Sequence, residues 1–150
     1  MSHKIVLANG VFDLLHAGHL EHLIQAKSFG DMLIVSITRD ASVNKGAGRP
    51  VYQEGDRASL VKALSCVDGV VLCDGLLDAL QTVRPHILVK GKDYADGGIN
   101  ELHLAYCKTH RIEVRYTDTP KISAFDELTK SRQRLIFATG GVGEGDVGVE

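Results

Sequence analysis

The 150-residue chain has no basic run, no apolar stretch long enough to cross a membrane and no Cys-x-x-Cys pair. At a formal net charge of −2, the missing basic run argues against nucleic acid as a partner. Because neither a signal peptide nor a spanning segment is recognisable, we expect no membrane contact. The cysteines Cys66, Cys73 and Cys107 are odd in number and scattered, which favours free thiols in a reducing compartment. The chain is therefore expected to be cytoplasmic.

What the chain does have is a regular alternation of short apolar runs with helical patterns. We expect strands at 5–8, 32–37, 69–72, 87–89 and 112–116, and helices at about 18–29, 54–65, 76–83, 99–109 and 123–136. Continuous apolar runs of this kind suit strands that are covered on both faces. The pattern predicts an α/β protein, a Rossmann-like open five-stranded parallel sheet with helices on both faces.

Two leucine stripes mark the buried sides of the second and third helices. One consists of Leu60, Val61 and Leu64, and the other of Leu76, Leu77 and Leu80. The last residues differ in kind, because they are rich in glycine and acidic residues and lack the apolar content that offsets ordering entropy. We expect one domain over 1–137 and a flexible Gly-rich tail over 138–150.

The most informative segment is 9–19, with the sequence NGVFDLLHAGH. It lies between an apolar run and an amphipathic one, which predicts a strand, a glycine-bearing loop and the first turn of a helix. Backbone N–H groups and the helix dipole favour an anion at such a point. His16 and His19 add N–H donors, and Gly10 and Gly18 allow a ligand to approach the backbone. The segment predicts phosphate chemistry, in which positioned donors stabilise charge on a reacting phosphate.

The histidines also have structural interpretations. His16 can cap a turn while His19 packs on the helix surface. His22 adds a third histidine at the same interval, as in some metal sites. However, each interval turns the next side chain further around the helix, away from His16. We therefore expect no set of side chains that binds a metal.

Segment 9–19 resembles the Gly-x-Phe-Asp-x-x-His-x-Gly-His signature of the cytidylyltransferase-like nucleotidyltransferases, which have a Rossmann-type fold. The resemblance implies that His16 and His19 stabilise the transition state of nucleotidyl transfer. It also implies a nucleotide pocket formed by Asn9, Gly10, Val11, Phe12, Asp13 and Gly18.

A second cluster, 44–51, follows the second expected strand and has the sequence NKGAGRPV. It is similar to the Lys-x-Gly-x-x-Arg-Pro-Val loop of glycerol-phosphate cytidylyltransferases and heptose-phosphate adenylyltransferases. The resemblance implies a catalytic Lys45 that contacts the phosphates of both substrates. Arg49 can hold an oxyanion of the nucleotide. Arg57, in the next helix, is expected to be a surface or dimer-contact residue.

A third cluster, 87–94, is a strand that runs into a loop with the sequence KGKDY. It resembles the Leu-Val-Lys-Gly-x-Asp-Tyr string of the heptose-phosphate adenylyltransferases. The resemblance implies an acceptor site formed by Lys90, Gly91, Asp93 and Tyr94. Ordinary loop charge is the alternative interpretation.

The fourth cluster, 118–127, departs from the family pattern. The family places Arg-Thr-x-x-Ile-Ser-Thr-Thr before its last helix, where hydroxyls and backbone N–H groups bind the triphosphate. Thr119, Ile122 and Ser123 match that pattern, but Asp118 stands at the arginine position. Ser123 with Asp126 also resembles a helix capping box, which would leave fewer groups for phosphate.

Together the motifs predict an enzyme that moves a nucleoside monophosphate group from ATP or CTP to a small phosphorylated acceptor, a sugar phosphate or glycerol phosphate. Pyrophosphate is the second product. Mg²⁺ is the expected cofactor because it neutralises the triphosphate, and the resemblance implies a homodimer. The alternative is a nucleotide-binding module with weakened or lost catalysis, which the altered fourth cluster favours.

Overall fold

The computed structural model describes residues 3–95 and 97–119. Five strands lie within these ranges, β1 (Ile5–Gly10), β2 (Met32–Thr38), β3 (Gly69–Cys73), β4 (Ile87–Gly91) and β5 (Glu113–Thr117). The α-helices are α1 (Ala17–Ser28), α2 (Glu54–Lys62), α3 (Leu76–Val83) and α4 (Glu101–Thr109). Two short 3₁₀ turns, η1 (Asp40–Ser42) and η2 (Lys92–Tyr94), follow β2 and β4. Each strand and helix expected before residue 120 is confirmed, with bounds that differ by a few residues.

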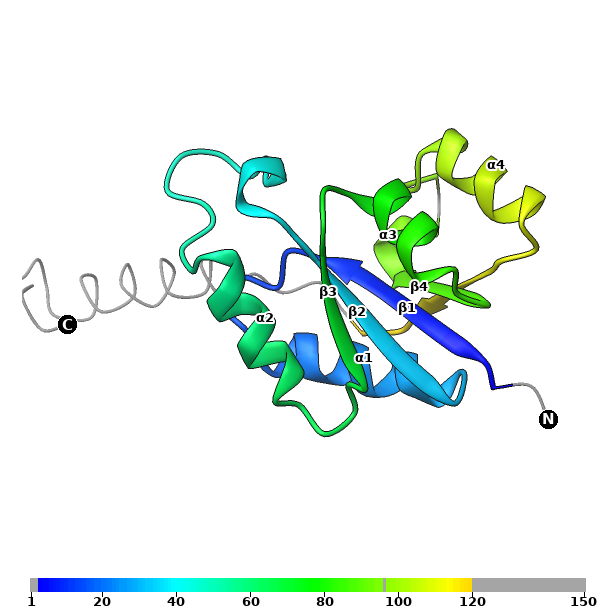
Figure 1. Cartoon of the computed structure of the whole chain (residues 1–150), viewed down its shortest axis with the longest axis horizontal. Coiled ribbons are helices and arrows are strands. Elements are labelled where there is room, and N and C mark those ends of the chain that lie inside the picture. The colour runs from blue at the N-terminus through cyan, green and yellow to red at the C-terminus, as the bar shows by residue number, and fades with distance from the viewer. Residues whose placement is uncertain (1–2, 96, 120–150) are drawn as a thin grey trace, which may run out of the picture.

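The strands form one parallel sheet in the order β3-β2-β1-β4-β5 (Figure 1). From β1 the chain adds β2 and then β3 on one side of the sheet. Strand β4 then pairs with the other side of β1. This reversal lies between β1 and β4, the point at which ligands bind in open α/β sheets. The predicted Rossmann-like sheet is confirmed.

Two hydrophobic clusters lie on opposite faces of the sheet, because alternate side chains of a strand point in opposite directions. Val6 and Ala8 of β1 pack with Leu23 of α1 and Val61 of α2. Leu7 of β1 packs instead with the cluster formed by α3 and α4. Figure 1 shows the corresponding layers, with α1 and α2 on one side of the strands and α3 and α4 on the other. The apolar runs are thus explained by burial on both faces.

The expected leucine stripes are partly wrong. Val61 and Leu80 are fully buried, but Leu60 is 45% exposed and Leu77 is 40% exposed. Adjacent helical residues lie about 100° apart, so Leu60 is turned away from the side of α2 on which Val61 is buried. Each stripe is therefore narrower than the sequence predicted.

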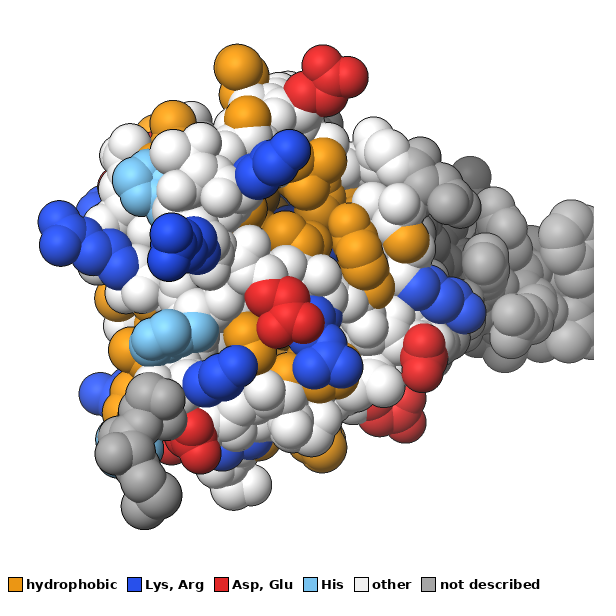
Figure 2. All heavy atoms as spheres, turned by 90° about the vertical axis from the view of Figure 1, so that its right-hand side faces the viewer, with side chains coloured by type: hydrophobic (Ala, Val, Ile, Leu, Met, Phe, Trp, Pro, Cys, Tyr) orange, Lys and Arg blue, Asp and Glu red, His pale blue; other side chains and the backbone are white. Residues whose placement is uncertain are grey.

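Figure 2 shows one face of the molecule, on which Lys and Arg side chains lie among acidic and hydrophobic ones. Within the described ranges, none of the helices is both long and apolar enough to cross a membrane. The expected last helix at 123–136, the tail at 138–150 and the site residues Ile122 and Ser123 lie outside the described residues. The division of the chain at residue 137 stays a prediction.

Candidate active site

The carboxyl end of β1 is tied to the neighbouring strand β2 by side chains. Asn9 donates its Nδ2–H to Ser36 Oγ at 2.7 Å, and Ser36 is fully buried. Thr38 donates its hydroxyl to the carbonyl of Gly10 at 3.3 Å. Gly10 ends the strand instead of lying in the loop, as the sequence had suggested. These bonds fix the strand end from which segment 11–16 departs.

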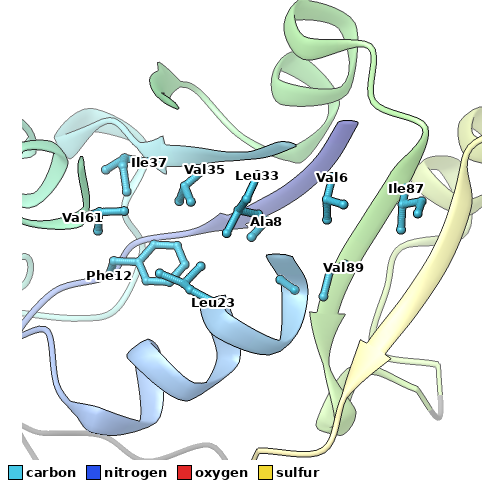
Figure 3. Packing of buried hydrophobic residues seen from close by; sticks show 11 residues of the cluster. Val6, Ala8, Phe12, Leu23, Leu33, Val35, Ile37, Val61, Ile87 and Val89 are labelled. Carbon is cyan, nitrogen blue, oxygen red and sulfur yellow. The ribbon is translucent and has the colours of Figure 1, made fainter. Parts of the chain in front are cut away.

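Segment 11–16 begins with a strained backbone. Phe12 and Leu14 have φ values of 51° and 52°, in the left-handed region that non-glycine residues rarely adopt. The Phe12 ring is 7% exposed and lies beside Leu23 in the hydrophobic core (Figure 3). A Cβ at Gly10 would lie 2.9 Å from that ring, so this position requires glycine. Phe12, predicted in the nucleotide pocket, therefore anchors the loop in the core.

His16 and His19 form a reciprocal cap at the start of α1. His16 Nδ1 accepts from the Gly18 backbone N–H at 3.0 Å, and His19 Nδ1 accepts from the His16 backbone N–H at 3.3 Å. Their rings are stacked, with centroids 4.0 Å apart. Because each Nδ1 accepts a hydrogen bond, each neutral ring carries its proton on Nε2. Capping and donation to a ligand are thus compatible, since they use different nitrogens of the same ring.

His19 is held in the neutral form. Burial is the main cause that lowers its pKa to about 4, and repulsion from His16, His22 and Lys45 adds to this effect, while Asp13 opposes it. The edge of the His19 ring also contacts Phe12, with centroids 5.4 Å apart. At neutral pH, His19 is therefore an uncharged donor that needs no proton exchange to bind a phosphate oxygen.

Asp13 joins this loop to the lysine loop, which we define as residues 43–53. Its carboxylate accepts from the backbone N–H groups of Val51 at 2.6 Å and Tyr52 at 3.0 Å, and from Arg49 Nε at 3.1 Å. Burial opposes ionisation, but these donors outweigh it and hold the pKa of Asp13 below its ordinary value. The side chain is 1% exposed, so Asp13 holds the lysine loop, while its predicted place in the nucleotide pocket stays a prediction.

Arg57 makes a second connection between the same segments, and its predicted place on the surface or at a dimer contact is wrong. The side chain is fully buried. It donates to the carbonyls of Tyr52 at 2.9 Å and Val11 at 2.8 Å, and to the Asp40 carboxylate at 2.6 Å. The rigid fork of donors in a guanidinium suits three acceptors from separate segments. Val11, predicted in the nucleotide pocket, thus offers its backbone carbonyl to Arg57.

Within the lysine loop, Lys45 is exposed and its charge is close enough to His19 to lower the pKa of that ring. Gly46 and Gly48 have φ values of 95° and 76°, which favour glycine and allow the sharp path of the loop. Arg49 is drawn toward Asp13. The structure therefore brings Lys45 to the histidine pair and gives Arg49 a role in holding the loop.

The predicted acceptor residues lie at the end of β4, next to β1 in the sheet. Lys90 and Gly91 are the last residues of that strand, and Asp93 and Tyr94 follow in η2. The Lys90 ammonium lies 4.7 Å from the centre of the Tyr94 ring, a cation–π contact. The order of the strands thus places this loop at the same sheet edge as the histidines.

Thr119 lies near α1 through a chain of hydroxyl contacts. His22 Nδ1 lies 2.7 Å from Thr117 Oγ1, which lies 3.3 Å from Thr119 Oγ1. One turn further along α1, Gln25 accepts from the Asp118 backbone N–H at 2.8 Å. These contacts explain why α1 and β5 pack together. Among the described residues no group of three or more His, Cys, Asp or Glu side chains could hold a metal ion.

Sequence reasoning missed four residues that hold the site together: Ser36, Asp40, Arg57 in its buried role, and Thr117. Asp40 and Thr117 lie at or just after the carboxyl ends of strands. Because sites in parallel sheets form at these ends, their position could have identified them as residues near the site. Arg57 offered none, because a single arginine in an amphipathic helix is usually exposed.

The family model described as cytidylyltransferase-like matches residues 7–137. The chain belongs to the cytidylyltransferase-like family. This match and the homologous proteins below make it a nucleotidyltransferase, as segment 9–19 predicted.

Among curated proteins, the chain is similar to the bifunctional protein HldE of Helicobacter pylori strain G27, with 53% identity over 95 residues. That match covers 61% of this chain and 20% of the relative. The bifunctional protein HldE of Geobacter metallireducens is 47% identical over 100 residues, which covers 64% of this chain and 20% of the relative. The chain thus spans about a fifth of the length of these relatives.

Among solved structures, the lipopolysaccharide core biosynthesis protein of Thermoplasma volcanium GSS1 has a TM-score of 0.69 and 26% identity. The match covers 80% of this chain and all of that one. The pantoate-beta-alanine ligase of Francisella tularensis has a TM-score of 0.62 and 19% identity, with 91% and 69% of the two chains covered. At that identity the second likeness shows the fold alone.

Proposed function

We propose that this nucleotidyltransferase moves a nucleoside monophosphate group from a nucleoside triphosphate to a sugar phosphate. The observation that carries the proposal is the stacked His16–His19 pair at the start of α1. Each ring uses Nδ1 within the protein and keeps its proton on Nε2. Two Nε2–H donors thus stand side by side at the end of β1, where an anion is also favoured by the helix dipole.

The reaction needs charge stabilisation more than proton transfer. An oxygen of the acceptor phosphate attacks the α-phosphorus, a new P–O bond forms, and the bond to the β-phosphate oxygen breaks to release pyrophosphate. The acceptor phosphate is ionised near neutral pH, so no residue has to act as its base. In this proposal, the Nε2–H groups of His16 and His19 donate to phosphate oxygens as charge accumulates on them.

In the proposed reaction, Lys45 and Lys90 supply positive charge for the phosphates. Lys45, on the lysine loop near His19, orients the phosphates of the two substrates. Lys90, at the end of β4 beside Tyr94, binds the acceptor. Because Lys45 follows β2 and Lys90 lies at the end of β4, the two lysines lie on either side of β1, and the acceptor and the triphosphate can lie across the histidine pair.

A sugar phosphate is the acceptor that the 87–94 loop favours, and ATP is the donor used in the branch of the family that this loop resembles. One of the similar solved structures, with a TM-score of 0.69, is that of a lipopolysaccharide core biosynthesis protein. This likeness supports a sugar phosphate as the acceptor. Glycerol phosphate with CTP is the pairing that the Thr119 segment favours.

We also propose that Mg²⁺ enters with the triphosphate. Magnesium commonly keeps several waters and binds phosphate oxygens together with few protein ligands. The described residues fit this mode, since none of them form a three-ligand cluster of their own. The ion would neutralise triphosphate charge, while the protein would supply the Nε2–H and lysine donors.

The test is pyrophosphate release from each pair of ATP or CTP with a sugar phosphate or glycerol phosphate, in the presence of Mg²⁺. We expect turnover with ATP and a sugar phosphate. His16→Ala should lower kcat about 100-fold or more, since removal of one positioned donor to a developing oxyanion costs roughly 10²–10³. Binding of triphosphate without pyrophosphate release under every pairing would favour the nucleotide-binding module instead.

A further inference from the structure

The second half of α1 faces the end of β5. His19, His22 and Gln25 follow one another at intervals of three residues along the helix. His19 completes the cap at the histidine pair, whereas His22 contacts Thr117 and Gln25 contacts Asp118. The helix that starts at the proposed phosphate site is thus also bonded to the segment that leads to Thr119.

The contact between His22 and Thr117 is partly buried. Thr117 is fully buried at the last position of β5, and its hydroxyl lies 2.7 Å from His22 Nδ1. The same hydroxyl lies 3.3 Å from that of Thr119, which is only partly buried. Gln25 fixes the intervening residue by accepting from the Asp118 N–H and donating Nε2–H to its carboxylate. His22, Thr117 and Thr119 therefore form a chain of polar groups that runs from the helix to the partly buried Thr119.

A chain of hydroxyls has a direction. A threonine hydroxyl has one proton, so Thr117 can donate either to His22 or to Thr119. If His22 donates from Nδ1, Thr117 donates to Thr119 and the Thr119 proton is left to face outward. If His22 accepts, Thr119 must donate inward to Thr117, and it then turns lone pairs outward. An anion at Thr119 is attracted by the first arrangement and repelled by the second.

We propose that His22 is a positioning residue that, through Thr117, orients the Thr119 hydroxyl as a donor to the triphosphate. The inference rests on the proposed function for the identity of the anion. It gives His22 a role distinct from that of His16 and His19, because His22 does not touch the substrate. Its effect is on the affinity for the triphosphate and not on the chemical step.

The test compares variants by KM for the triphosphate, by kcat and by calorimetric Kd. His22→Leu and Thr117→Val should each raise the triphosphate KM and Kd about tenfold, since a hydrogen bond to a charged group is worth about 1.5–3 kcal/mol. We expect kcat and the acceptor KM to change less than about threefold. The double variant should lose no more than either single one, because both break the same chain.

Conservative variants separate this role from simple packing. His22→Asn places an amide nitrogen near the position of Nδ1 and should restore most of the affinity, as should Thr117→Ser. His22→Asp can only accept, so it should bind the triphosphate more weakly than His22→Leu. His103→Leu, on α4 across the sheet, is the control and should leave all constants unchanged. Melting temperatures identify any variant that does not fold.

Two results would overturn the inference: an unchanged triphosphate KM and Kd in folded His22→Leu, or no recovery in His22→Asn and Thr117→Ser. Failure of the proposed function is a different outcome. A wild-type chain that binds triphosphate without turnover would refute nucleotidyl transfer, while the Kd comparison would still test His22.

Discussion

At the scale of single residues, the histidine pair shows how one side chain serves structure and chemistry together. His16 and His19 satisfy backbone N–H groups at the start of α1, which would otherwise lack intrahelical partners. The same bonds fix the ring orientations and direct both protons to Nε2. The capping interpretation and the catalytic one, which are alternatives in the sequence, are thus combined in the structure.

The His19 ring should titrate well below the ordinary range of a histidine. Its pKa of about 4, lowered mainly by burial, means that the folded chain keeps the ring neutral while the unfolded chain protonates it near 6.5. We expect the His19 ring resonance to titrate with a midpoint near 4 in an NMR experiment. A midpoint at 6 or above would contradict the burial of the ring.

The same shift has a consequence for stability. Between pH 6.5 and about 4 the unfolded state binds a proton that the folded state does not, so this residue makes stability fall as the pH falls. In the His19→Asn chain that contribution is absent. Its free energy of unfolding should therefore depend less steeply on pH in this range than that of the wild type, as urea titrations at several pH values would show.

At the scale of elements, two buried charges hold the loops that surround the site. Asp13 binds three donors of the lysine loop, and Arg57 binds acceptors from three segments of the chain. Tyr52 is held from both sides, since its N–H donates to Asp13 and its carbonyl accepts from Arg57. Lys45 belongs to the loop that these bonds hold, so we infer that they also set its approach to His19.

Replacement of the buried Arg57 should lower the stability of the chain. Arg57→Met keeps the volume but leaves the carbonyls of Val11 and Tyr52 without their donor, so it should cost about 3 kcal/mol of unfolding free energy. Arg39→Met is the matched control, because the Arg39–Asp74 pair is exposed and such pairs contribute about 0–1 kcal/mol. Urea unfolding of both variants makes the comparison. Equal losses would show that the buried contacts of Arg57 add nothing.

At the scale of the whole molecule, the strand order decides where the clusters meet. Because β4 returns to the side of β1, the loops after both strands lie at one edge of the sheet. The histidine pair, the lysine loop and the Lys90–Tyr94 contact share that edge. Most of these side chains follow the ends of strands and Lys90 lies at the end of β4, so the parallel sheet supplies the rigid support.

Removal of Mg²⁺ should stop the reaction without unfolding the chain. In the proposed reaction Mg²⁺ enters with the triphosphate and neutralises its charge, so it should be needed for turnover but not for folding. EDTA should abolish pyrophosphate release while the melting temperature of the ligand-free chain stays unchanged, and added Mg²⁺ should restore turnover. A drop in the melting temperature with EDTA alone would reveal a resident metal site.

The sequence by itself determined the order and approximate bounds of the strands and helices up to residue 119. It did so because apolar periodicity is a local property, legible over a few residues. It also located the histidine pair, since a glycine-bearing loop between a strand and a helix has a local signature. The nucleotidyltransferase family followed from that segment, and the family match confirmed it.

Only the tertiary structure decided the contacts that join distant parts of the chain. Arg57 meets Val11 across 46 residues, and Thr117 meets His22 across 95. Whether a charged or polar side chain is buried depends on the partners that folding brings to it, and a local pattern cannot specify them. For this reason the sequence placed Arg57 on the surface and did not reveal the contacts of Asp13 with the lysine loop. The fold instead uses both inside the protein to hold the loops around the two histidines.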